Sequence, residues 1–205
     1  MSRGRGGVQQ RRPSDAAKRR SILVFAEGSK TEPIYLTHWH RLYRERVIVA
    51  VDPFHGTPLR IVEEAAATRT RDLREARRGR GDAYDEYWCV FDIDEHPRVE
   101  EAIKLAADNG INVAVSNPCI ELWFLLHFQD QQASIDRAQA QRKVAEMLGC
   151  GKVPTTAALG QLAGRYDQAQ VRAQKLDEKH RRDGSPTRSN PSSGVWCLIE
   201  RIRTP

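Results

Sequence analysis

The sequence predicts an α/β protein in which a mostly parallel sheet is flanked by helices. Four short apolar runs are typical of strands, and they occupy residues 22–26, 47–51, 87–91 and 111–115. Segments with apolar residues at helical spacing lie between these runs. This alternation favours parallel strands joined by right-handed crossovers, with helices on both faces of the sheet.

The first half of the chain contains the strands and their connecting helices. The run Ile22–Ala26 is apolar throughout, as expected for a strand that is covered on both faces. Thr31 is a good N-cap for the helix that follows, with Pro33 in its first turn. Two further helices are expected between the strands, over residues 57–79 and 97–109.

The second half of the chain predicts helices only. Asn117 is a candidate helix cap with Pro118 at the first helical position, and the nearly apolar segment 119–128 is expected to be deeply buried. Three more helices are predicted, over residues 133–148, over residues 155–183, and after a second helix-start signature at Ser189-Asn190-Pro191. These segments should form a helical extension.

These patterns divide the 205 residues into a basic tail at 1–20, a core at 21–130 and an extension at 131–205 that packs on the core. The tail lacks the apolar centre of a signal peptide, and no run approaches the ~18 apolar residues of a membrane span. The four cysteines include no C-x-x-C pair, which argues against a zinc site or a disulfide framework. We therefore expect a cytoplasmic protein without membrane association.

The formal net charge of +6 originates in the first 20 residues, which contain seven basic residues and one acid. The rest of the chain balances 26 basic against 26 acidic residues. A disordered cationic tail is suited to nucleic acid, although a purely solubilising role accounts for it equally well. Two internal basic clusters either solvate a face or supply nucleic-acid-binding residues, namely Arg71, Arg74, Arg78, Arg181 and Arg182.

Carboxylates follow two of the predicted strands. Glu27 comes directly after the first strand, and Asp92 and Asp94 follow the third. Ligands of parallel sheets bind beyond the carboxyl ends of the strands, so these three side chains are expected to converge. Oxygen ligands with little His or Cys nearby favour Mg²⁺ or Mn²⁺ over zinc, and such ions assist phosphodiester hydrolysis. Glu27 is then a metal ligand, a general base or a general acid.

Other interpretations of the acidic segments stay open. An Asp-x-Asp pair is common, and an aspartate at a strand end often only caps the next helix. Haloacid-dehalogenase phosphatases place their nucleophile after the first strand, whereas this pair follows the third. The segment 27–31 lacks the leading glycine and the spacing of a Walker A loop. A non-catalytic nucleic-acid-binding subunit and a nucleotidyl transferase are the competing functional classes, and the short chain argues against the second.

Several neighbours of these carboxylates are secondary candidates: Glu32, Lys30, Glu95, His96 and Glu121. Glu32 lies in the first turn of a predicted helix, where it either complements the helix dipole or takes part in the site. Glu121 is costly in a nearly apolar helix unless it is paired or binds metal. His127 in the same helix is expected to be a core histidine.

In order, spacing and residue type the chain resembles the Toprim fold, the catalytic domain of topoisomerases, bacterial primases and OLD-family nucleases. That fold has a glutamate after its first strand and an Asp-x-Asp pair after its third, as at Glu27, Asp92 and Asp94. A closer resemblance is to the RloB family and covers nearly all of residues 21–205. It rests on four ordered blocks, at 24–33, 90–96, 116–128 and 189–193.

The resemblance implies a nuclease-like role in bacterial anti-phage defence of the abortive-infection type. It implies an ABC/AAA-type ATPase as an accompanying sensor or regulator. It also implies a catalytic set of Glu27, Asp92 and Asp94 that works with Mg²⁺ or Mn²⁺ on RNA or DNA.

Overall fold

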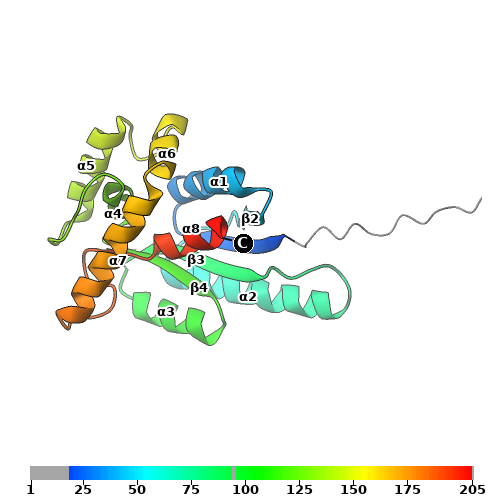
Figure 1. Cartoon of the computed structure of the whole chain (residues 1–205). Coiled ribbons are helices and arrows are strands. Elements are labelled where there is room, and N and C mark those ends of the chain that lie inside the picture. The colour runs from blue at the N-terminus through cyan, green and yellow to red at the C-terminus, as the bar shows by residue number, and fades with distance from the viewer. Residues whose placement is uncertain (1–18, 94–95, 205) are drawn as a thin grey trace, which may run out of the picture.

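The computed structural model describes residues 19–93 and 96–204, which form a five-stranded sheet covered by helices on both faces (Figure 1). The strands lie in the order β2-β1-β3-β4-β5. Their bounds are Arg20–Ala26 for β1, Val47–Val51 for β2, Glu86–Asp92 for β3, Asn112–Asn117 for β4 and Ser192–Ser193 for β5. Strands β1 to β4 are parallel and β5 is antiparallel to β4, which confirms the predicted α/β class.

The continuous apolar runs of the central strands supply two separate cores. Ile22 and Val24 of β1 pack in one core, and Leu23 and Phe25 pack in the other. Successive side chains of a strand point to opposite faces, so an uninterrupted apolar run buries both faces. The same alternation places Asp92 on the face of β3 to which Val90 also points.

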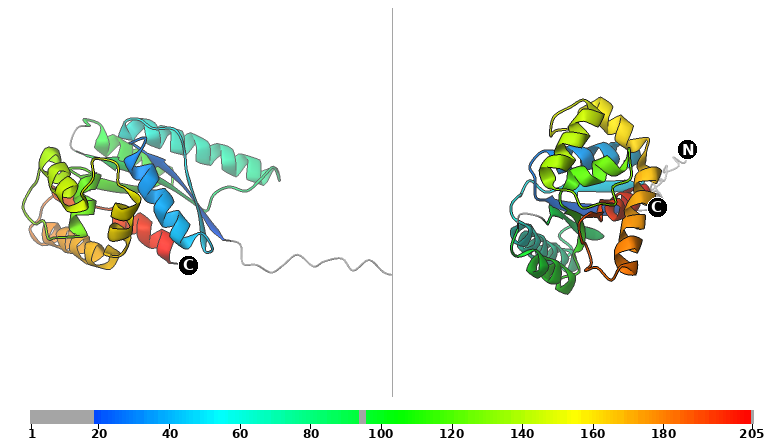
Figure 2. Two further views of the ribbon diagram at one scale, coloured as in Figure 1. Left: turned by 90° about the horizontal axis from the view of Figure 1, so that it is seen from above. Right: turned by 90° about the vertical axis from the view of Figure 1, so that its left-hand side faces the viewer.

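Two groups of helices cover the sheet, as the views in Figures 1 and 2 show. Helices α2 (Pro58–Arg77) and α3 (Val99–Asp108) pack on one face. Helix α1 (Thr31–Tyr43) packs on the other face together with the C-terminal helices. These are α4 Ile120–Leu126, α5 Arg137–Leu148, α6 Thr156–Ala163, α7 Tyr166–Arg182 and α8 Val195–Arg203. Within the described residues, no helix has the length and apolar character needed to cross a bilayer.

The predicted starts of α1 and α4 are wrong. Thr31 is the first residue of α1 rather than its cap, and its hydroxyl donates to the carbonyl oxygen of Lys152 at 3.3 Å. This contact ties the start of α1 to a loop far away in the sequence. The Asn117–Pro118 bond is cis, and α4 begins only at Ile120, after Cys119 in an extended conformation.

The long helix predicted over residues 155–183 is two helices. Helix α6 ends at Ala163, and α7 begins at Tyr166. Gly164 and Arg165 lie between them, and glycine is a poor helix former because it gains the most backbone freedom outside a helix. Similarly, the helix predicted from residue 133 begins at Arg137, where Asp136 accepts a capping hydrogen bond from the backbone N–H of Gln139 at 2.8 Å.

The C-terminal extension adds a strand to the sheet as well as helices. The predicted helix start at Ser189-Asn190-Pro191 leads instead into β5, where Ser193 pairs with Ser116 of β4. Helix α8 follows β5, and its Leu198 and Ile199 are fully buried in the core that β1 also lines.

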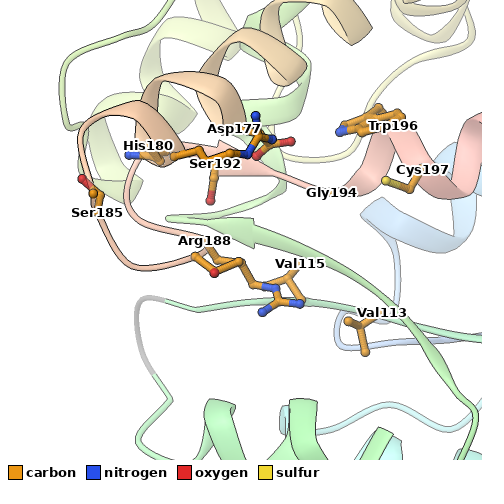
Figure 3. Close-up of a pocket in the computed structure, with 13 residues that line it drawn as sticks. Val113, Val115, Asp177, His180, Ser185, Arg188, Ser192, Gly194, Trp196 and Cys197 are labelled. Carbon is orange, nitrogen blue, oxygen red and sulfur yellow. The ribbon is translucent and has the colours of Figure 1, made fainter. Parts of the chain in front are cut away.

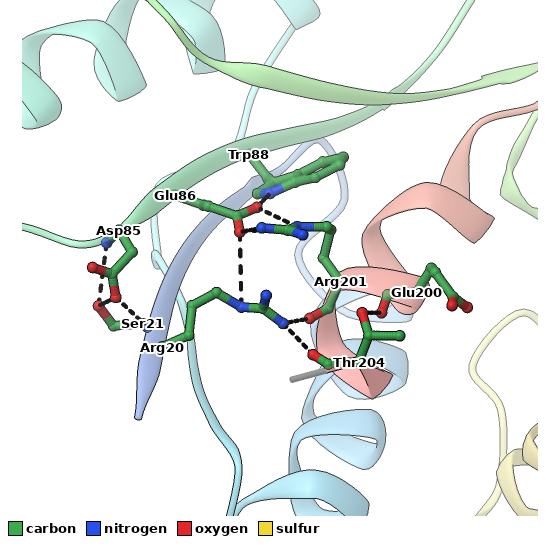
Figure 4. Close-up of polar contacts among 8 residues, drawn as sticks. All are labelled: Arg20, Ser21, Asp85, Glu86, Trp88, Glu200, Arg201 and Thr204. Carbon is green, nitrogen blue, oxygen red and sulfur yellow. Dashed lines mark hydrogen bonds and ion pairs between the residues drawn. The ribbon is translucent and has the colours of Figure 1, made fainter. Parts of the chain in front are cut away.

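A network of charged side chains fastens α8 to the amino end of the sheet (Figure 4). Glu86 of β3 accepts hydrogen bonds from Arg201 Nε at 3.0 Å and from Trp88 Nε1 at 2.9 Å. Arg20 of β1 donates to the carbonyl oxygens of Arg201 and Thr204. Burial alone would raise the pKa of Glu86, but these hydrogen bonds and arginine charges lower it overall.

Candidate functional site

The carboxyl ends of β1 and β3 lie side by side. The register pairs Ala26 with Val90, and the backbone N–H of Glu27 donates to the carbonyl oxygen of Val90 at 2.9 Å. Asp92 ends β3 and pairs with Ser116 of β4. Glu27 and Asp92 therefore lie side by side at the carboxyl ends of the strands, because neighbouring parallel strands run in the same direction.

The Glu27 carboxylate is held by two contacts to the segment around the end of β3. Its Oε2 accepts a hydrogen bond from the backbone N–H of Asp92 at 2.9 Å. Its Oε1 lies 2.9 Å from His96 Nε2, and the two side chains form an ion pair when the imidazole is protonated. His96, a secondary candidate from the sequence, is thus in direct contact with Glu27.

Asp92 is almost fully buried, with 6% of its surface exposed. Burial and then the charges of Glu27 and Glu32 raise the pKa of Asp92 well above its usual range. Arg137 of α5 opposes this rise, since its Nη2 lies 3.4 Å from Asp92 Oδ2. A cation beside Asp92 favours the charged carboxylate.

Glu32 and Glu121 bring two more buried carboxylates to the same place, with 6% and 3% of their surfaces exposed. Burial is the main cause of the raised pKa of Glu32, and the charges of Glu27 and Glu121 add to it. Among the described residues, Glu121 Oε1 has no hydrogen-bond partner. A buried carboxylate oxygen without a partner is costly and favours a proton or a cation beside it.

One pocket of about 340 Å³ unites these groups. Its acidic lining residues are Glu27, Glu32, Asp92 and Glu121, and its basic ones are Lys30, His55, Arg137 and Lys152. Lys30 and the carboxylates are sequence predictions that the fold brings together. Sequence reasoning missed His55, Arg137 and Lys152, because they lie on separate segments that no motif connects.

The residues of the pocket fit a hard divalent cation by their chemistry. The acidic donors are all oxygen atoms, and the unpaired Glu121 Oε1 is a ligand without a partner. In residues 19–93 and 96–204, however, no group of three or more His, Cys, Asp or Glu side chains is arranged to hold one ion. Two predicted members of the site, Asp94 and Glu95, lie outside the described residues.

The predicted nucleic-acid-binding arginines do not line this pocket. Helix α2 begins after the carboxyl end of β2 and ends before the amino end of β3. Its last turns therefore lie near the amino ends of the strands, away from the carboxyl ends where Glu27 and Asp92 lie. Arg74 and Arg78 are therefore remote from Asp92, and Arg71 lies one turn before Arg74 in α2, a helix whose far end extends away from α4 and α5 in Figure 1. Arg181 and Arg182 lie at the end of α7 and are exposed.

Comparison with protein families relates this chain to a known family. No curated protein matches the chain. A family model described as RloB-like protein matches residues 22–202, which include all four blocks that carry the resemblance and every described carboxylate of the pocket. The chain therefore belongs to the RloB-like family.

Proposed function

We propose that this protein is a Mg²⁺- or Mn²⁺-dependent nuclease that hydrolyses phosphodiester bonds. The observation that carries the proposal is the pocket at the carboxyl ends of β1 and β3, where four carboxylates face basic side chains. Acidic groups attract a divalent cation, and basic groups attract the phosphates of a nucleic acid. The predicted Toprim-type pattern of Glu27, Asp92 and Asp94 supports the same reaction class.

The metal would be held by Asp92 and Glu27, with Glu121 beside them and Asp94 as the predicted further ligand. When bound, Mg²⁺ or Mn²⁺ supplies Lewis-acid polarisation of the phosphodiester and activates water. The hydrogen bond from the Asp92 N–H uses one lone pair of Glu27 Oε2, so the Glu27 carboxylate keeps lone pairs for this role.

The other residues in and beside the pocket have roles that follow from their positions. His96 contacts Glu27 Oε1 at 2.9 Å and is placed to give or take a proton from that carboxylate. Lys30 and Lys152 line the same pocket and offer positive charge to the phosphate that is cleaved. Arg137 orients Asp92 through its contact at 3.4 Å.

The test is cleavage of labelled single- and double-stranded RNA and DNA, with and without Mn²⁺. Asp92→Asn and Glu121→Gln each remove one carboxylate charge from a crowded acidic pocket, so we expect both variants to stay folded. We expect each to lower metal-dependent cleavage by about a hundredfold. Glu146→Gln on the exposed side of α5 is the matched control and should cleave like the wild type. Cleavage that persists in Asp92→Asn at the wild-type rate would refute the assignment.

A non-catalytic nucleic-acid-binding or regulatory subunit is the second candidate. It is favoured by the exposed arginines at the ends of α2 and α7, which lie outside the acidic pocket. This candidate predicts nucleic-acid binding that Asp92→Asn leaves unchanged, with no turnover in any metal.

The biological setting we propose is bacterial anti-phage defence with an ABC/AAA-type ATPase partner, in the cytoplasm. Its support is the RloB-type resemblance alone. Co-purification of an ATPase with the tagged protein, and loss of phage resistance in Asp92→Asn cells, are the expected observations.

A further inference from the structure

A second pocket, of about 540 Å³, lies beside the outer edge of the sheet and shares no residue with the acidic pocket (Figure 3). Its walls are the end of α7, the loop after it, β5, the start of α8, and Val113 and Val115 of β4. A volume of this size is ordinary for a small-molecule site.

Unpaired polar atoms gather around this pocket. In the described part of the chain, eight buried side-chain polar atoms have no hydrogen-bond partner. Three of the eight belong to residues that line this pocket, namely His180 Nδ1, Ser192 Oγ and Trp196 Nε1. His180 and Ser192 are themselves 6% and 3% exposed. Buried polar groups are nearly always paired in folded proteins, so such a concentration favours a polar partner at this pocket, either water or a ligand.

The three atoms offer a mixed set of donors and acceptors. His180 Nε2 lies 2.9 Å from the carbonyl oxygen of Pro191 and therefore carries the proton, which leaves Nδ1 as an acceptor. Trp196 Nε1 is a donor only, and the Ser192 hydroxyl serves as either. A nucleobase edge presents donors and acceptors side by side, and the half-buried Trp196 ring offers a surface for stacking.

Positive charge lies at the same pocket. Arg188 lines the pocket, its charge lowers the pKa of Asp177, and Figure 3 shows its side chain reaching from its loop towards Val115. Its backbone has a φ of 64°, a conformation that is uncommon outside glycine and is found at functional positions. Arg181 also lines the pocket, although it pairs with the exposed Glu178.

One acidic side chain faces these groups. Asp177 lines the pocket, and its burial is the main cause of its raised pKa, which Trp196, His180 and the two arginines oppose. The indole N–H lies close enough to Asp177 to lower the pKa of the carboxyl group, but the contact does not have hydrogen-bond geometry, and Trp196 Nε1 has no bonded partner. Asp177 is therefore available to accept a hydrogen bond from an amino group on a base.

We propose that this pocket binds a nucleoside phosphate, with the base against Trp196 and the phosphate beside Arg188 and Arg181. The exocyclic amine of a purine or cytosine base donates to Asp177 or His180, and Ser192 completes the polar contacts. The site is independent of the acidic pocket and requires no divalent cation.

The test is isothermal titration calorimetry of the full chain in EDTA with AMP, GMP, CMP and UMP, and with inorganic phosphate alone. We expect at least one nucleotide to bind about tenfold more tightly than phosphate. Ser192→Ala and Arg188→Asn should each weaken this binding about fivefold or more. Asparagine tolerates the positive φ at residue 188, and Ser192→Ala removes an unpaired hydroxyl, so neither change should unfold the protein.

Two controls separate this site from the rest of the molecule. Lys175→Gln removes a charge from the exposed side of the same helix α7 and should bind like the wild type. Asp92→Asn should also retain binding, so a failure of the nuclease proposal leaves this result intact. A 5′-phosphorylated tetranucleotide shows whether the source is a free nucleotide or a strand end. No heat with any nucleotide, equal affinity for phosphate, or wild-type binding by both Ser192→Ala and Arg188→Asn would overturn the proposal.

Discussion

Gly28 shows at the scale of one residue how closely the acidic pocket is packed. A Cβ atom at this position would lie 2.4 Å from Glu32 Oε2. The absence of a side chain therefore lets the Glu32 carboxylate approach the backbone between Glu27 and Lys30. Because Glu32 is nearly buried, the packing around it leaves its carboxylate few alternative positions.

Gly28→Ala should displace the Glu32 carboxylate and disturb the pocket without unfolding the chain. The Glu32 side chain is flexible, so we expect the melting temperature to change by only a few degrees, about 1 kcal/mol or less. Metal-dependent cleavage should fall by about tenfold or more, since small misplacements in a site are costly. Gly160→Ala in α6 is the control, because an added Cβ there meets nothing within 4 Å. Equal activity in the two variants would argue against a role for the position of Glu32.

Helix α4 illustrates at the scale of an element how a short helix can be entirely internal. All seven of its residues are buried, including Glu121, and His127 follows at its C-cap. His127 Nδ1 donates to the carbonyl oxygen of Trp123 at 2.8 Å, and its ring packs edge-on against the Trp123 ring. The expectation of a core histidine is thereby confirmed. Burial lowers the pKa of His127 to about 4.

The lowered pKa of His127 predicts a loss of stability in mild acid. The unfolded chain takes up this proton near pH 6.5 and the folded chain only near pH 4, so stability is present above 6.5 and is lost as the pH falls towards 4. Between pH 7 and pH 4.5 the contribution is about 2 kcal/mol. Urea unfolding should show that the free energy of unfolding of the wild type falls between pH 7 and pH 4.5. The fall should be about 2 kcal/mol smaller for His127→Gln, which lacks the imidazole. Parallel pH profiles for the two proteins would contradict it.

At the scale of the whole molecule, the acidic pocket and the predicted nucleic-acid-binding arginines of α2 lie at opposite ends of the parallel strands. From Pro58 to Arg74 helix α2 rises about 24 Å, at about 1.5 Å per residue. The arginines of its last turns therefore cannot touch the same short stretch of nucleic acid as the acidic pocket. A longer substrate is needed to contact both.

Arg74→Gln combined with Arg78→Gln should therefore affect binding according to substrate length. We expect weaker binding of strands of about 20 nucleotides. The slope of the logarithm of affinity against the logarithm of salt concentration should fall by about 1–2, because two phosphate contacts are lost. Binding of a tetranucleotide should be unchanged. Lys104→Gln with Lys175→Gln is the control of equal charge, on exposed positions of α3 and α7. An equal loss of affinity for both substrate lengths, or the same loss in the control, would exclude a specific role for this end of α2.

The sequence by itself determined the four parallel strands and the carboxylates at the ends of two of them. The runs that form β1 and β3 are locally apolar, and Glu27 and Asp92 follow them directly. The alternation of strands and helices along the sequence was therefore enough to place both carboxylates at the carboxyl ends of neighbouring parallel strands. The parallel sheet and the flanking helices followed from the same alternation. Local signals were weaker at helix ends, where Thr31 and Pro118 have partners and conformations that depend on distant segments.

Only the tertiary structure decided what surrounds those carboxylates. Arg137 reaches Asp92 from a helix 45 residues further on, and Lys152 joins the pocket from a loop that contacts Thr31. The short strand β5 and the second pocket likewise depend on the chain end returning to β4. Packing between distant elements sets these contacts, and no local spacing encodes which of many basic or polar side chains will be brought to a given edge of the sheet.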